Sequence, residues 1–161
     1  MKKAALLLVA FCSLYLLISC SNPRQPAQVV SSSAVTPSSS SEEGAARYIR
    51  VQSEETVVVF ALNHSSAAQS LYQQLPLTLP VEDYSNNEKI FYPPQPLDTS
   101  DTPLADSSCQ FAYYAPWGDC VMFYDDFSPS SGLYALGSAV SGEADISALS
   151  GTLSIEACPS P

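Results

Sequence analysis

Basic residues are scarce in this chain. It carries six Lys and Arg residues against 16 Asp and Glu residues, which gives a formal net charge of −10. A protein that binds nucleic acid needs a basic surface to neutralise phosphates, so we expect neither DNA nor RNA as a partner. The composition also argues against electrostatic docking on anionic lipid. It favours a soluble, mutually repulsive surface, and the recruitment of cationic ligands by acidic patches is the alternative.

Histidine and closely spaced cysteines, the usual zinc ligands, are equally rare. The only histidine is His64 and no Cys-x-x-Cys occurs, so we expect no zinc site. A Ser-His-Asp triad would have to use His64, which precedes a predicted helix and is expected to be a solvated turn residue. The acidic pairs Glu82-Asp83 and Asp125-Asp126 lack the spaced oxygens of a calcium loop. We therefore predict no catalytic residue, no metal and no cofactor.

No apolar run is long enough for a confident membrane span. The longest, Ala4–Ile18, has 15 residues, whereas a spanning helix needs about 20. It follows Lys2 and Lys3 and has the length of a secretory signal core. The last two residues of this run and the two that follow it, Leu17–Cys20 (Leu-Ile-Ser-Cys), resemble the lipobox of bacterial lipoprotein signal peptides. The alternative is an ordinary signal peptide cut near Ser19.

The lipobox resemblance implies that residues 1–19 are removed and that Cys20 carries lipid. Two or more acyl chains anchor a protein stably where one does not. Residues 20–45 are rich in Ser and Pro without apolar periodicity, so we predict a flexible linker. Residues 46–158 then form one domain. We expect a lipid-anchored protein of the cell membrane or outer membrane, with its domain extracytoplasmic.

The cysteines do not define a disulfide framework. Cys12 falls in the signal and Cys20 at the anchor, which leaves Cys109, Cys120 and Cys158. An exported compartment permits disulfides, but three is an odd number, so at least one thiol stays unpaired within the chain. Buried cysteines acting as small apolar residues are the simplest expectation.

Short strands dominate the pattern of the domain. The clearest are two segments flanking the turn Ala115–Gly118, which has Pro and Gly where a type I turn prefers them. One helix is predicted from Ser66, with Ser66 and Gln69 as a capping box, and residues 93–108 are predicted to be a long loop. The pattern indicates a β-barrel or sandwich capped by a helix. The predicted strands are Tyr48–Gln52, Thr56–Leu62, Leu77–Val81, Gln110–Tyr114, Cys120–Tyr124, Leu133–Val140 and Thr152–Cys158.

An ordered set of short segments resembles the small bacterial cyclophilin-like proteins, a family of largely unassigned function. The segments are Asn63–Ala68, Leu75–Leu77, Asn87–Lys89, Tyr92-Pro93, Ala115–Asp119, Phe123–Phe127 and Leu136-Gly137. The resemblance covers residues 47–158. It implies a mainly β fold, an eight-stranded barrel with one main capping helix.

The chain departs from true cyclophilins at their catalytic segments. The resemblance would place an arginine in a Phe-His-Arg segment and later a Gln-Gly-Gly-Asp, and neither string occurs. Prolyl isomerisation needs a donor near the prolyl nitrogen to lower a barrier of about 20 kcal/mol. We therefore favour a non-catalytic module that binds a peptide or small ligand. A weak peptidyl-prolyl isomerase acting on exported proteins is the alternative.

The aromatic residues offer the best candidate site. Many are explained by core packing, but Trp117 sits at a turn, where full burial is difficult, and turns carry function more often than cores do. We predict that Glu88, Tyr92 and Trp117 border an apolar groove with one carboxylate, suited to a peptide or small ligand.

Overall fold

The computed structural model describes residues 46–161, so the predicted signal peptide, the lipid attachment at Cys20 and the linker through residue 45 lie outside the described residues. None of the helices within residues 46–161 has the length and apolar character needed to cross a membrane. The elements are β1 (Arg47–Ser53), β2 (Thr56–Leu62), α1 (Ser66–Tyr72), β3 (Leu77–Pro80), β4 (Glu82–Tyr84), β5 (Glu88–Phe91), β6 (Phe111–Tyr114), β7 (Asp119–Phe123), β8 (Leu133–Ser141), the 3-10 helix η1 (Glu143–Ala148) and β9 (Thr152–Cys158).

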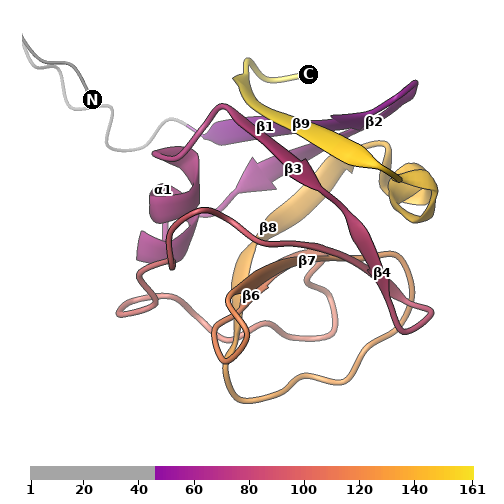
Figure 1. Cartoon of the computed structure of the whole chain (residues 1–161). Coiled ribbons are helices and arrows are strands. Elements are labelled where there is room, and N and C mark those ends of the chain that lie inside the picture. Colours follow the sequence, from indigo (N-terminus) through magenta and orange to yellow (C-terminus); the bar gives the residue numbers. More distant parts are fainter. Residues whose placement is uncertain (1–45) are drawn as a thin grey trace, which may run out of the picture. The chain divides into compact units, whose positions relative to one another are not determined.

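All nine strands belong to one antiparallel sheet, in the order β3-β9-β1-β2-β8-β6-β7-β5-β4 (Figure 1). The mainly β fold with one main helix is confirmed, but the expected count of eight strands is wrong. The predicted pattern contained neither β4 nor β5. β4 is three exposed residues with no apolar alternation, and β5 contains the buried Lys89, so neither has the composition of an ordinary strand.

The sheet curls round on itself, and its two edge strands, β3 and β4, follow one another directly in the sequence. β3, at one end of the strand order, pairs with β9, and β4, at the other end, pairs with β5. Only Val81 separates β3 from β4, and its N–H donates to the carbonyl oxygen of Gly151 at 3.0 Å. One extended segment therefore joins both ends, and the sheet is a nearly closed barrel.

β8 carries the sharpest change of partner in this barrel. Its first half pairs with β6 and its second half with β2, and Gly137 belongs to both ladders, opposite Phe111 in one and Leu62 in the other. Both ladders shift register close to this point. Glycine kinks and bulges are how barrel strands bend at corners. Leu136-Gly137, one of the segments on which the family resemblance was based, therefore lies at a corner of the barrel.

The barrel interior is a continuous apolar core. Three rings form its centre: the centroid of Phe111 lies 4.7 Å from that of Phe60 and 6.2 Å from that of Phe91. α1 packs its apolar face on this core through Ala67, Ala68 and Leu71. Burial of this apolar surface is the main stabilising contribution.

The start of α1 differs by one residue from the prediction. Ser65, not Ser66, is the N-cap, and its Oγ accepts from the N–H of Ala68 at 3.3 Å. The N–H of Ser66 instead donates to Asp101 at 2.7 Å, and the N–H of Ala67 donates to Thr102 at 3.1 Å. The predicted capping box on Gln69 does not form, because acceptors from a distant loop satisfy the first turn of the helix.

That loop is the long segment between β5 and β6, and several hydrogen bonds hold it in place. Besides Asp101 and Thr102, its Gln95 exchanges hydrogen bonds with Gln74, and the N–H of Leu97 donates to the Tyr113 hydroxyl at 3.3 Å. The long loop predicted for residues 93–108 is therefore an ordered cover. Its Leu97 packs into the barrel core, and its Ala105 joins an apolar cluster with Val121, Phe123 and Leu133 on the outer face.

Candidate functional site

A second apolar cluster lies on the outer face of the sheet, opposite the barrel core. Strand alternation turns Phe91 and Met122 inward while their neighbours Ile90 and Val121 face outward. The outward cluster comprises Ile90, Ala105, Cys109, Ala112, Val121, Phe123 and Leu133, with Tyr114, Phe127 and Ala135 packed against it. An apolar outer face that is only partly covered by loops leaves room for a ligand site.

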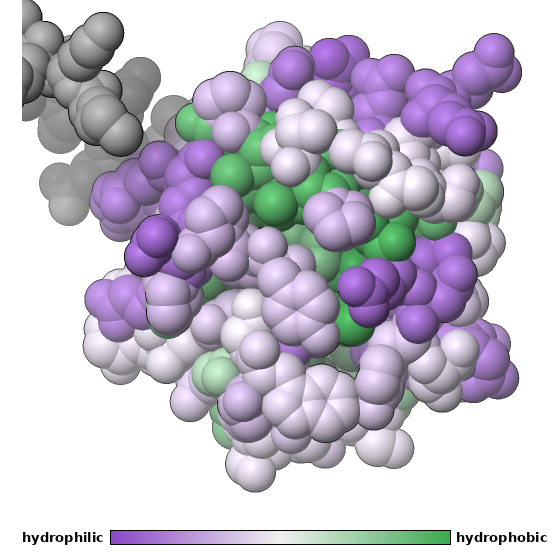
Figure 2. Space-filling model, viewed as in Figure 1, coloured by the Kyte–Doolittle hydropathy of each residue, from purple (hydrophilic) through white to green (hydrophobic). Residues whose placement is uncertain are grey.

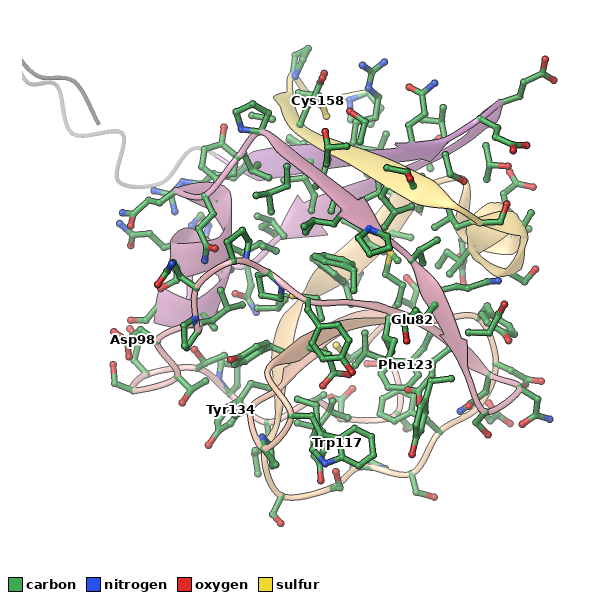
Figure 3. All side chains as sticks on the ribbon, in the orientation of Figure 1. Glu82, Asp98, Trp117, Phe123, Tyr134 and Cys158 are labelled. Atoms are coloured by element: carbon green, nitrogen blue, oxygen red, sulfur yellow. The ribbon has the colours of Figure 1, made fainter. Side chains whose placement is uncertain are left out.

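A cavity of about 540 Å³ opens on this face. Asp119, Val121 and Phe123, which alternate along β7, contribute to it with Glu88 of β5, and the residues that follow β7, from Asp126 to Ser130, form a wall. Figure 3 shows Trp117 and Phe123 in the lower part of the view, far from Cys158 at the top. This volume lies within the range of pockets that bind small molecules.

Three aromatic rings form one side of the cavity. Trp117 is 54% exposed and meets Tyr84 and Tyr114 edge to face, each with 5.3 Å between ring centroids. The turn holds Trp117 there, because its N–H and that of Gly118 both donate to the carbonyl oxygen of Tyr114. Gly118 has a φ of 79°, a conformation that glycine adopts without strain. A turn forms at the predicted place, but its hydrogen bonds begin at Tyr114 and not at Ala115, so the predicted positions of Pro and Gly within it are wrong by one residue. The turn positions an accessible ring at the cavity.

Asp119 is the most unusual residue of the site. It is 2% exposed, and within residues 46–161 its Oδ1 has no hydrogen-bond partner. Burial raises the pKa of this carboxyl above its ordinary value, although a hydrogen bond from its own N–H opposes the shift. A buried acceptor without a donor costs about 1–3 kcal/mol, and more when it is charged. The contacts within the fold therefore do not explain why a carboxylate is buried at this position.

Glu88 supplies a second carboxylate to the cavity. Burial raises its pKa, and the negative charge of Asp119 raises it further. Glu88 lies opposite Phe123 in the ladder, four residues along β7 from Asp119. At about 3.4 Å of rise per residue, the Cα atoms of Glu88 and Asp119 are about 14 Å apart along the strand direction. The cavity thus has a carboxylate towards each end of its floor.

The wall that follows β7 is held across the cavity by Asn87. The side-chain amide of Asn87 donates to the carbonyl oxygen of Asp126 at 3.1 Å, and its own carbonyl oxygen accepts from the N–H of Tyr124 at 3.0 Å. Phe127 then stacks on Phe123 with 3.7 Å between ring centroids. These contacts give the cavity a defined wall before any ligand arrives, which lowers the entropy cost of binding.

Comparison with known proteins identifies the fold. Residues 51–156 match the Cyclophilin-like family. The chain belongs to this family. Among solved structures, the cyclophilin-like domain is similar to the solution structure of a hypothetical protein from Archaeoglobus fulgidus, with a TM-score of 0.56 and 15% sequence identity over 72% of this chain and 98% of that one. No curated protein matches the sequence.

The cyclophilin-like domain brings together two of the three predicted groove residues. Glu88 and Trp117 both line the cavity, whereas Tyr92 is not among its lining residues. The pairing of β5 with β7 ends at Phe91, so Tyr92 already belongs to the loop. Slight burial and the nearby negative charges of Asp119 and Glu82 raise the pKa of the Tyr92 hydroxyl.

Most lining residues were absent from the predicted groove, and the most informative of these are Tyr84, Tyr114 and Asp119. The alternation Asp119-x-Val121-x-Phe123 puts a carboxylate on the face of two apolar residues, and this signal could have identified Asp119. Tyr114 follows from the same alternation in β6. Tyr84 could not be found in this way, since it reaches the site only because the short strand β4 pairs with β5.

The remaining candidate residues do not form a second site. His64 is exposed in the turn before α1, as expected. Asp83 forms an ion pair with Lys89, with 2.5 Å between Oδ1 and Nζ. Among residues 46–161, no group of three His, Cys, Asp or Glu side chains is placed to hold a metal ion.

The three cysteines of the domain are free thiols in the structure. Cys109 and Cys120 are buried, which agrees with the expectation that they act as small apolar residues, whereas Cys158 is half-buried. Burial raises the pKa of all three thiols, that of Cys120 well above its ordinary value. None of them therefore has the lowered pKa of an activated nucleophile.

Proposed function

We propose that this protein is a lipid-anchored, extracytoplasmic binding protein whose cyclophilin-like domain takes up a small ligand or peptide in the cavity beside Trp117. The observation that carries the proposal is the pairing of an accessible aromatic side with a buried carboxylate that lacks a partner. Burying such a carboxylate for packing alone is unfavourable. A ligand that donates a hydrogen bond to it supplies the missing contact.

The alternative, a weak peptidyl-prolyl isomerase, finds less support in the cavity. An isomerase of this fold requires a hydrogen-bond donor beside the prolyl nitrogen, and the two arginines of the domain do not line the cavity. Arg50 pairs with Glu156 at 3.2 Å, and the Arg47 guanidinium lies 5.6 Å from the centroid of the Tyr72 ring. The cavity instead offers the acceptors Glu88 and Asp119. We therefore favour binding without catalysis.

The first experiment tests binding through the only tryptophan of the chain, Trp117. We expect ligands of the cavity to change its fluorescence in a screen of small molecules and short peptides. Replacing Trp117 by Ala should leave the fold intact, since the side chain is half exposed, but should weaken binding of the hits measured by calorimetry. A screen without hits, together with unfolding of Trp117→Ala, would mean that the ring is structural.

The lipid anchor is proposed from the lipobox of Leu17–Cys20 and the apolar segment before it. Each buried methylene of an acyl chain contributes about 0.8 kcal/mol to membrane affinity. The acidic composition offers no electrostatic substitute for lipid.

We expect Cys20→Ala to release the protein from membranes in its native host. Cell fractionation and mass spectrometry of the mature amino terminus measure the outcome. Ser21→Ala is the control, because it leaves the lipidated residue in place. Unchanged membrane association of Cys20→Ala, with no lipid on the wild-type protein, would rule out this anchor.

A further inference from the structure

We propose that the ligand carries an organic cation, an alkylammonium or guanidinium group, which donates to Oδ1 of Asp119 and lies against the aromatic side formed by Tyr84, Tyr114 and Trp117. This inference rests on the proposed function, since it names the chemistry of the ligand in the same cavity. It is carried by the placement of one orphaned acceptor next to three electron-rich rings.

The first argument is the hydrogen-bonding capacity of Asp119. An ionised carboxylate only accepts hydrogen bonds, so the buried Oδ1 requires a donor from outside the described residues. A neutral donor would supply the missing hydrogen bond but would leave the buried negative charge uncompensated. A cationic donor would also compensate the buried charge, and charge-assisted hydrogen bonds are roughly twice as strong as neutral ones.

The second argument is the charge of the lining. Glu88, Asp119 and Asp126 contribute to the cavity, and no Lys or Arg is among the lining residues. The buried Lys89 faces away from this site, and its ammonium group pairs with Asp83. The electrostatic field of the cavity is therefore negative without an internal counter-charge, which disfavours an anionic ligand and favours a cation.

The third argument separates an organic cation from a metal ion. Calcium and magnesium require several converging oxygen ligands, and residues 46–161 bring no three such groups together. The faces of tryptophan and tyrosine attract ammonium and guanidinium groups. Figure 2 shows that the lower part of the visible face, where Figure 3 places Trp117, has intermediate hydropathy, whereas strongly apolar residues gather above it. Such an amphipathic site suits a cation with an apolar body.

The test compares probes of one shape and three charges. Phenethylamine, 2-phenylethanol and phenylacetate are titrated into the domain at neutral pH and followed by calorimetry and Trp117 fluorescence. A second series, N-acetyl-lysine amide against N-acetyl-norleucine amide, distinguishes a peptide side chain from a free amine. We expect the cation of at least one series to bind about tenfold more tightly than its neutral analogue, the size of one charge-assisted hydrogen bond.

Two variants assign this preference to the cavity. Asp119→Asn should reduce the preference of the cation over its neutral analogue to twofold or less. Glu55→Gln removes the same unit of charge from the exposed β1–β2 turn and should leave the preference unchanged, which excludes a general effect of the acidic chain.

Each other outcome overturns the cation inference. These outcomes are equal binding of amine and alcohol, tightest binding of phenylacetate, an undiminished preference in Asp119→Asn, or no binding of any probe. The proposed function is judged separately, because neutral or anionic hits in the Trp117 fluorescence screen would support a binding cavity even where the cation inference fails.

Discussion

Replacing Gly137 by alanine is expected to lower the free energy of unfolding by about 3 kcal/mol or more, at the upper end of the effect of overpacking. A Cβ at this position would lie 2.1 Å from the carbonyl oxygen of Ala61 and 3.1 Å from the Cα of Leu62. Both neighbours are backbone atoms of β2, so neither can move aside as a flexible side chain would. Relief requires separating β8 from β2 at the corner of the barrel.

Gly151→Ala provides the matched control. Gly151 has a φ of 68°, but nothing lies within 4 Å of its prospective Cβ. The alanine there meets only the conformational penalty of the left-handed region, about 1–2 kcal/mol. Urea denaturation followed by circular dichroism measures both variants. Equal losses for the two would show that β8 can shift, and that the corner tolerates a side chain.

The sequence pattern predicted the elements of the fold that depend on neighbouring residues and missed those that depend on distant contacts. The hairpin of β6 and β7 was predictable because its apolar alternation and its Pro-x-Gly turn segment act over neighbouring residues. β4 was not, because its three exposed residues are held by pairing with β5. The N-cap at Ser65 was displaced from the prediction because the first turn of α1 is completed by Asp101 and Thr102, more than 30 residues away.

The candidate site shows the same division between local and distant contributions. Trp117 was predictable from its turn, and Glu88 from a segment shared with the family. The exclusion of Tyr92 depends on where the β5–β7 ladder ends, and the inclusion of Tyr84 depends on β4. Asp119 belongs to the segment Ala115–Asp119, which resembles the family, but its lack of a hydrogen-bond partner is a property of the packed structure alone.

Asp119→Asn is expected to stabilise the ligand-free domain by about 1–2 kcal/mol at neutral pH, while weakening the binding of cations. The folded-state pKa of Asp119 is raised, so the native state binds more protons than the unfolded chain between the unfolded value, about 3.9, and the folded value. Stability therefore falls as the pH rises through this window. Above this pH window, the buried ionised carboxylate lowers the free energy of unfolding by its full amount. The isosteric amide of Asp119→Asn carries no charge and does not have this cost.

The difference in stability between Asp119→Asn and the wild type should consequently shrink as the pH falls towards 4. Taking this difference removes the separate contributions of Asp101 and Asp106, whose lowered pKa values act in the opposite sense and at more acidic pH. Glu88 requires a second comparison, because the charge of Asp119 contributes to its raised pKa. The double variant with Glu88→Gln measures that coupling, and the other titratable groups at the cavity are Asp126, Tyr84 and Tyr114.

Thermal unfolding of the ligand-free proteins between pH 4 and pH 8 measures these differences. A gain that stays constant over this range would show that the charge of Asp119 is not its origin, and a loss of stability at neutral pH would show that the carboxylate has a structural partner. A carboxylate that weakens the empty domain and strengthens the bound one is the signature of a residue retained for its ligand. In this barrel, Asp119 is the side chain at which folding and binding make opposite demands.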